Sequence, residues 1–124
     1  MEVILPSGCG NAPRAVIVAD MVSAWAAGET AAVRPWLDDH VTWTVMGGET
    51  LQGPDAVLRT VPSSPPERLE FLSVLTHGRM AACDGALVAT GRRVGFCHMI
   101  RFTGAARTAR IADVRTYLEP SRIA

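Results

Sequence analysis

A histidine within an apolar strand pattern is the most chemically informative feature of this sequence. In the segment Val94–Thr103 alternate residues form an apolar row, and His98 interrupts it. An imidazole can accept or donate a proton near neutral pH, so His98 is a candidate general acid or base. A neutral core histidine held by one hydrogen bond explains the same pattern equally well.

A carboxylate lies in the middle of the preceding expected strand, Met80–Thr90. Asp84 is costly there unless it is exposed or paired. A three-residue loop in the hairpin at Gly91 places Asp84 directly across from His98. A two-residue loop places Gly85 there and turns Asp84 to the other face, because one residue of slip reverses every side chain. The sequence leaves both registers open and slightly favours an exposed Asp84.

The elements that must position these residues follow a simple order. Asn11, Ala12 and Pro13 resemble a helix start, an apolar stripe follows at three- and four-residue spacing, and Gly28 ends the helix. Two short helices are expected at Thr30–Leu37 and from Gly53 to Val61. The expected strands are Val41–Met46, Arg68–Thr76, Met80–Thr90, Val94–Thr103 and Thr108–Leu118. Helices followed by a run of hairpin-connected strands indicate an α+β fold.

Length and composition restrict the function classes. The 124 residues fit one domain, which we place at 11–119 between a flexible tail at 1–10 and a short tail at 120–124. Lys+Arg and Asp+Glu balance at 12 each, so nucleic acid is not an expected partner. No apolar run approaches the ~20 residues that cross a bilayer, and the first residues are too short for a signal-peptide core. We therefore expect no membrane association and a cytoplasmic location.

Cysteine and histidine spacing predicts no metal site, and we also expect no bound cofactor. Cys9, Cys83 and Cys97 are odd in number and lack a C-x-x-C pair, which is typical of reduced thiols. The three histidines do not add a ligand spacing to them. We interpret Cys83 and Cys97 as small buried hydrophobic residues.

Three segments together resemble a known superfamily. They are Trp25-Ala26-Ala27-Gly28-Glu29, then Leu37-Asp38-Asp39 with the later Gly53-Pro54-Asp55-Ala56-Val57, and finally Phe96–Phe102 followed by Ile111–Leu118. Their order is similar to the SnoaL-like and ketosteroid isomerase-like branch of the nuclear transport factor 2-like superfamily. The resemblance covers about Ala12 to Glu119. It implies a cone-shaped, curved antiparallel sheet wrapped around the long N-terminal helix, as in cystatin-like folds, with a pocket between them and frequent dimerisation.

The catalytic sets of the resembled enzymes are broken in this chain. The tyrosine, general-base aspartate and oxyanion-hole aspartate of ketosteroid isomerases fall at Met21, Thr44 and His98. A methionine and a threonine cannot replace a phenol and a carboxylate base, so that chemistry is not expected. The aspartate–arginine–aspartate set of the epoxide hydrolases falls near Asp84, Ala82 and Thr116, and it is broken as well.

The resemblance and the strand pattern disagree about one face. The resembled register turns Thr42 and Thr44 into the cavity, whereas alternation groups Trp43 with Val41 and Val45. We leave this face open. The candidate catalytic residues are His98, Asp84 and Thr44, with Thr44 orienting a substrate or water. The expected ligand-binding residues are Met21, Trp25, Trp43, Phe96, Ile100, Val114, Thr116 and Leu118.

The sequence thus favours a pocket protein that binds a small apolar molecule. Cofactor-free acid–base chemistry, as in an isomerase, cyclase or dehydratase, is the enzymatic form of this hypothesis. The alternative is a non-catalytic interaction domain whose pocket is filled by its own side chains. In either case we expect a homodimer through the outer face of the sheet, where Met99, Arg101, Arg115 and Tyr117 lie.

Overall fold

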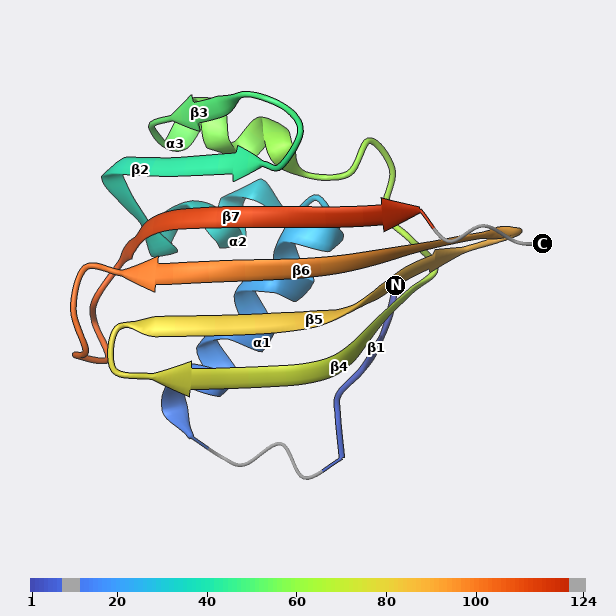
Figure 1. The fold of residues 1–124 in the computed structure, drawn as a ribbon, viewed down its shortest axis with the longest axis horizontal. Helices are drawn as coiled ribbons and strands as arrows, with labels where there is room; N and C mark the ends of the chain where they lie inside the picture. Colours follow the sequence, from blue (N-terminus) through green and yellow to red (C-terminus); the bar gives the residue numbers. More distant parts are fainter. Residues whose placement is uncertain (8–11, 121–124) are drawn as a thin grey trace.

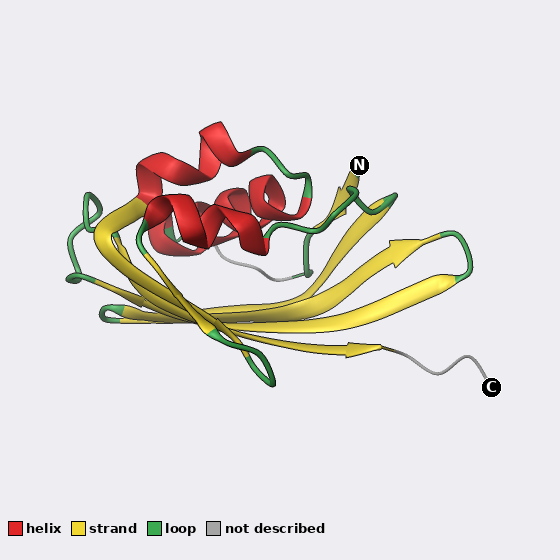
Figure 2. Cartoon of the chain, turned by 90° about the horizontal axis from the view of Figure 1, so that it is seen from above, coloured by secondary structure: helices red, strands yellow, loops and turns green. Residues whose placement is uncertain are grey.

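The computed structural model describes residues 1–7 and 12–120, and it shows helices packed on one face of a curved sheet (Figures 1 and 2). The helices are α1 (Pro13–Ala26), α2 (Thr30–Val33) and α3 (Pro54–Val57), and 3-10 turns follow at Arg34–Trp36 and Leu58–Thr60. The strands are β1 (Glu2–Ile4), β2 (Leu37–Val45), β3 (Thr50–Gln52), β4 (Arg68–His77), β5 (Met80–Ala89), β6 (Arg92–Phe102) and β7 (Ile111–Pro120). The predicted α+β class is confirmed.

The sheet has the order β1-β4-β5-β6-β7-β2-β3. Strands β4 to β7 form an antiparallel meander, and β2 and β3 form a hairpin. Two pairs are parallel, β1 with β4 and β2 with β7, so the sheet is mixed and not wholly antiparallel as expected. The parallel pair β2–β7 brings the first long strand beside the last one.

The N-terminal segment differs from the expected tail. Residues 2–4 form β1, which pairs in parallel with the edge strand β4, from Glu2 opposite Arg68 to Ile4 opposite Glu70. The backbone of an edge strand has N–H and C=O groups without partners. A segment of three residues can pair with these groups even when its side chains show no apolar–polar alternation. The expected helix cap Asn11 and the thiol of Cys9 lie outside the described residues.

Helix α1 provides the layer that covers the sheet. It begins at Pro13, buries a stripe that includes Val18, Val22 and Trp25, and ends before Gly28, which has a φ of +75°. Glycine adopts this left-handed conformation without strain, which explains the predicted stop. None of the helices in the described part of the chain is long and apolar enough to cross a membrane.

A glycine and a β-bulge mark one bend of the sheet. The register between β4 and β5 shifts at Leu72, so two residues of β4 oppose one step of β5. Next to this shift, a Cβ on Gly85 would lie 1.8 Å from the backbone oxygen of Glu70. Bulges increase the local twist and bend a strand, and only glycine permits so close a backbone approach. This bend is one source of the concave face on which α1 lies.

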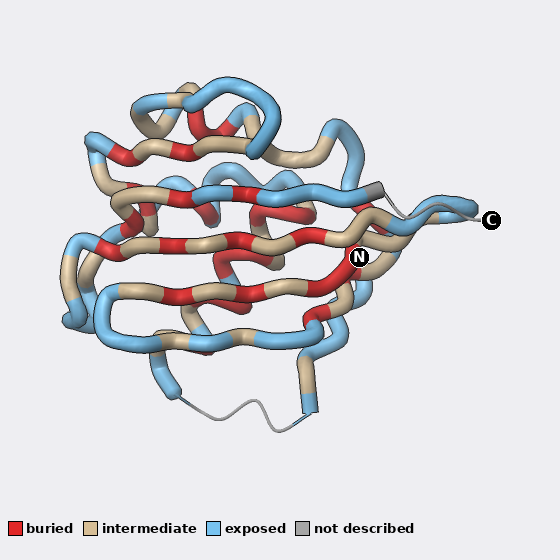
Figure 3. Tube along the Cα trace, in the orientation of Figure 1, coloured by how far each residue is buried: buried red, intermediate tan, exposed pale blue. Residues whose placement is uncertain are grey.

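Buried and more exposed residues alternate along the strands of the sheet (Figure 3). Along each strand, every second residue faces the concave side and joins the core. Val41 and Trp43 do so on β2, and Ile100 and Phe102 do so on β6. No helix in the described part of the chain covers the convex face (Figure 2).

Candidate functional site

His98 lies in a dry aromatic cluster beneath α1. Its side chain is 1% exposed. The imidazole ring meets Trp25 at a centroid distance of 4.7 Å and an interplanar angle of 85°. Trp43 lies 6.0 Å away at 80°, and Phe96 lies 5.2 Å away. The strand parity that placed His98 on the concave face is correct, but aromatic rings surround the imidazole there.

One hydroxyl group connects the polar atoms of this cluster. The indole Nε1 of Trp43 donates to Thr116 Oγ1 at 2.8 Å, and His98 Nδ1 lies 2.8 Å from the same oxygen. If the Thr116 hydroxyl donates to Nδ1, only the Nε2–H of His98 is left without a partner. If Nδ1–H donates instead, the hydroxyl hydrogen and the Nε2 lone pair are both left unpaired. Counting donors and acceptors therefore assigns the proton of His98 to Nε2.

Burial keeps this histidine neutral. Desolvation disfavours the charged imidazolium and lowers the pKa of His98 from 6.5 to about 3. Its Nε2 atom is buried and has no hydrogen-bond partner among the described residues. A side chain in this state holds the core together through Thr116, and it is not positioned to exchange protons with solvent.

Asp84 does not face His98. The β5–β6 hairpin turns at Thr90 and Gly91, which places Cys83 opposite His98 and Asp84 opposite Cys97. The loop has two residues, as in one of the two expected alternatives, but it begins one residue earlier in the chain. For this reason Cys83, and not Gly85, lies opposite His98. Asp84 consequently faces away from His98, as in the slightly favoured alternative, but it is half-buried and not exposed, and its Oδ1 atom has no hydrogen-bond partner among the described residues.

The burial of β2 shows which of its two faces lies inward, a question that the sequence left open. Trp43 is 1% exposed and lies inward with Val41, whereas Thr44 lies on the outer face and shares a hydrogen bond of 2.7 Å with Thr50. Alternation was therefore the better guide, and the register taken from the resembled enzymes was wrong for Thr44. Thr116 is inward and fully buried, and Tyr117 is outward and 41% exposed, as expected.

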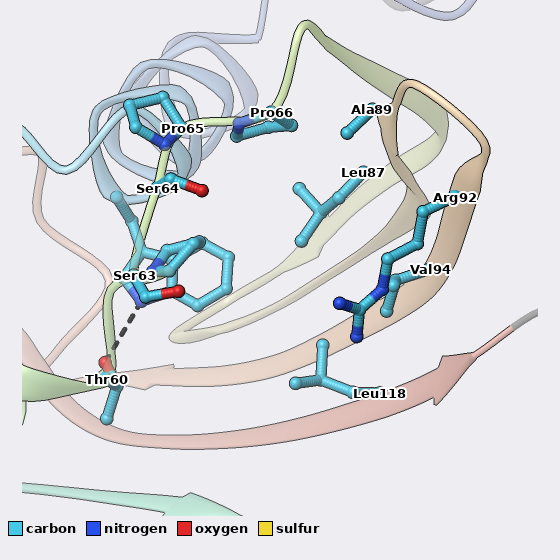
Figure 4. Close-up of a pocket in the computed structure, with 12 residues that line it drawn as sticks. Thr60, Ser63, Ser64, Pro65, Pro66, Leu87, Ala89, Arg92, Val94 and Leu118 are labelled. Carbon is cyan, nitrogen blue, oxygen red and sulfur yellow. Dashed lines mark hydrogen bonds between the residues drawn. The ribbon is translucent and has the colours of Figure 1, made fainter.

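A mostly apolar pocket lies at the open end of the concave face (Figure 4). It has a volume of about 270 Å³ and lies between the loop that follows α3 and the inner side of the β5–β6 hairpin. Pro62, Pro65 and Pro66 form the loop wall together with Ser63 and Ser64; Leu87, Ala89, Arg92, Val94 and Leu118 form the sheet wall. Trp25 and Thr60 close the inner end, where Trp25 Nε1 donates to Thr60 Oγ1 at 3.0 Å.

The pocket exists because the sheet is longer than the helix layer. Leu87 and Val94 are partners in the β5–β6 register and continue the concave apolar row beyond Phe96. The end of the β5–β6 hairpin extends past α1 and has no helix above it (Figures 1 and 2). The proline-rich loop partly covers Leu87 and Val94 and leaves the hollow.

The expected ligand-binding residues divide into two groups. Trp25 and Leu118 line this pocket. The others do not: Met21, Trp43, Ile100, Val114 and Thr116 are at most 1% exposed and Phe96 is 4% exposed. They belong to the buried core in this structure, and their part in ligand binding stays a prediction. The concave face is apolar along its whole length, and strand parity alone does not distinguish the part beneath α1 from the part beyond it.

Sequence reasoning missed Arg92 and the loop 62–66. One available signal was the hairpin itself, since Leu87 and Val94 stay apolar close to the turn. The other was the run of prolines, which fixes a loop in a preformed shape.

The buried thiol of Cys83 has no chemical role in this arrangement. It is 2% exposed, and burial raises its pKa to about 12. Cys97 is half-buried on the convex face, so the expectation of burial is correct for Cys83 and wrong for Cys97. Within the described residues no cluster of histidine, cysteine or acidic side chains could hold a metal ion.

Comparison with solved structures identifies the fold. A nuclear transport factor 2-like protein of unknown function from Burkholderia xenovorans matches with a TM-score of 0.71 and 18% identity, covering 90% of this chain and 84% of that chain. A steroid delta-isomerase from Pseudomonas aeruginosa has a TM-score of 0.67 and 19% identity, covering 89% and 82%. A SnoaL-like protein from Shewanella denitrificans has a TM-score of 0.66 and 10% identity, covering 87% and 92%.

The chain therefore has the nuclear transport factor 2-like fold, as the resemblance predicted. No protein-family model and no curated protein sequence matches it. At these identities the structural likeness shows the fold alone, and the fold carries many unrelated activities. The function has to be argued from the site.

Proposed function

We propose that this protein binds a small, mostly apolar molecule in the pocket at the open end of its sheet. The observation that supports this most is the lining of the pocket. Trp25, Leu87, Val94, Leu118 and three prolines offer apolar surface, and a few polar groups lie among them. Binding sites for small molecules have this composition, and a hollow of about 270 Å³ is near the lower end of their usual size.

The catalytic form of the hypothesis has less support. His98, Asp84 and Thr44 are not among the residues that line the pocket. Trp25 contacts the imidazole on one side and lines the pocket on the other. The acid–base roles of these three residues stay predictions, and binding without turnover is the function that we propose.

A neutral aromatic probe tests the proposal. The indole N–H signals of the tryptophans are resolved in proton–nitrogen NMR spectra, and Trp25 is the one that lines the pocket. We expect 3-phenylpropanamide at millimolar concentration to shift the Trp25 signal. The Trp43 signal should move little, because its N–H donates to Thr116 in the core.

Two neighbouring substitutions on β5 provide the matched comparison. Leu87 faces the pocket, and Val88 faces the other side of the sheet, where it pairs with Arg68 and Arg93. Leu87→Trp should fill the hollow and abolish the shift, and Val88→Trp should leave it intact. A shift that survives Leu87→Trp would place the probe elsewhere and refute the proposed site. Mass spectrometry of molecules released from the purified protein would identify a natural occupant.

A non-catalytic interaction domain is the second candidate. It is favoured by the filled interior beneath α1, where Met21, Ile100 and Val114 are at most 1% exposed. The convex face also exposes apolar side chains, with Leu75 at 66%. An absence of any response at Trp25 would leave this candidate ahead.

A further inference from the structure

Arg92 places a positive charge inside a mostly apolar pocket. It lies on β6 in the same inward row as Val94, Phe96 and His98, and its strand partner is Ala89. Figure 4 shows its guanidinium turned into the hollow beside Leu118. Strand geometry, rather than chance exposure, therefore directs this side chain to the concave face.

The neighbouring residue, Arg93, differs from Arg92 because it is paired with a carboxylate. Arg93 lies on the opposite face and binds Glu70 at 2.9 Å, and Arg68 binds the other oxygen of that carboxylate at 2.7 Å. These two arginines lower the pKa of Glu70 through their hydrogen bonds. Among the residues that the structure describes, no carboxylate forms an ion pair with Arg92.

The remaining polar groups of the pocket are neutral. Ser63 and Ser64 present hydroxyl groups from the loop that faces the hairpin (Figure 4). Of the lining residues Arg92 is the one that carries a charge. A guanidinium donates paired hydrogen bonds that match the two oxygens of a carboxylate. The pocket thus combines an apolar body with an anion-binding group at one side.

Pocket volume limits the size of the partner. A water molecule takes about 30 Å³ of liquid volume. A hollow of about 270 Å³ therefore holds a molecule of roughly ten non-hydrogen atoms. A single ring or a short aliphatic chain with one acidic group has this size.

We propose that the pocket selects small carboxylic acids with an apolar body, and that Arg92 binds the carboxylate. This inference rests on the proposed function, because it names the class of ligand for the same pocket. The apolar chain or ring lies against Trp25, Leu87 and Leu118, and the carboxylate lies at the hairpin side. The serine hydroxyls across the hollow can donate to the same group.

A pair of isosteric probes separates the two proposals. The acid 3-phenylpropanoate and its amide 3-phenylpropanamide have the same shape and differ in charge. Titrations followed at the Trp25 indole signal give the two affinities. We expect the acid to bind about tenfold more tightly than the amide, since hydrogen bonds to charged groups are the stronger ones. The preference should decrease with added salt, because Arg92 is exposed.

Adjacent residues on opposite faces supply the control. Arg92→Gln should remove the tenfold preference, so that the acid and the amide bind with similar affinities. Arg93→Gln should preserve the tenfold preference, because Arg93 faces the other side of the sheet. Circular dichroism would verify that both variants are folded.

The outcomes are distinct. Equal affinities of acid and amide for the native protein would overturn the carboxylate inference and leave the proposed pocket standing. A preference retained by Arg92→Gln would overturn the role of Arg92. No shift with either probe would overturn the proposed function and the inference with it.

Discussion

Replacing Thr116 by valine tests the polar centre of the core. Valine keeps the β-branched shape that suits a strand, and it removes the hydroxyl that serves two partners. The indole N–H of Trp43 and Nδ1 of His98 would both lose their hydrogen bond. Both side chains are 1% exposed, so water cannot replace the lost partner.

The magnitude follows from the number of groups left without partners. Each buried donor or acceptor that loses its partner costs about 1–3 kcal/mol. Two such groups give a loss of about 2–6 kcal/mol, and the added methyl group of valine offsets about 0.8 kcal/mol of it. We therefore expect Thr116→Val to lower the free energy of unfolding by about 2–4 kcal/mol, at the centre of this range. For a domain of this size the corresponding fall in Tm is on the order of 10–20 °C.

Urea denaturation followed by tryptophan fluorescence measures this change. The matched control is Thr44→Val, which removes a hydroxyl bonded to Thr50 at the exposed face of β2. Water replaces that bond, so the control should cost less than about 1 kcal/mol. A double-mutant cycle with Trp43→Phe should show that the two losses are less than additive. If Thr116→Val costs no more than Thr44→Val, the hydroxyl does not have the role that we assign to it.

Three further predictions concern pH, the bend of the sheet and assembly. Since burial lowers the pKa of His98 from 6.5 to about 3, the unfolded chain binds more protons between these values. Stability should therefore be complete above pH 6.5 and fall by roughly 1.4 kcal/mol per pH unit below it, a slope that His98→Asn should lose in urea titrations at several pH values. Gly85→Ala should lower the free energy of unfolding by more than the ~1–3 kcal/mol of ordinary overpacking, because its Cβ would lie 1.8 Å from the backbone oxygen of Glu70. The protein should be a homodimer through the convex face in light scattering, and Met99→Glu with Tyr117→Glu should give a monomer; a native monomer at micromolar concentration would refute this.

Each of these measurements has an outcome that contradicts the reasoning. A pH dependence of stability that is the same in His98→Asn would show that other groups cause it. A fully stable Gly85→Ala protein would mean that β4 can move away from β5 at the bulge without loss.

Most of the fold could be predicted from local patterns. Helix α1 ends before Gly28, and strands β4 to β7 lie within a few residues of their expected bounds, because alternation and turn residues act locally. Strands β1 and β3 were missed. Each has three residues and is stabilised by backbone pairing with a longer neighbour, which leaves no side-chain pattern in the sequence.

The candidate site could be predicted only in part. The sequence correctly placed His98 and Thr116 on the concave face and Trp25 on the apolar stripe of α1, since strand and helix periods determine the face of a residue. It could not show that the imidazole is enclosed by aromatic rings, because enclosure depends on how far α1 extends across the sheet. Hairpin register was also undetermined, and it decides that Cys83 and not Asp84 lies opposite His98.

The position of Trp25 explains why the concave face has two different environments. On one side of the indole lies His98, neutral and without access to water. On the other side lies the hollow that ends at Arg92, which is exposed and charged. Acid–base chemistry requires a titratable group in contact with the substrate, and anion binding requires a positive charge that the ligand can reach. Burial keeps the His98 imidazole out of contact with a substrate. Arg92 lies beyond the helices, so its charge stays accessible. The geometry of the described residues therefore favours recognition of an acid over proton transfer to or from it.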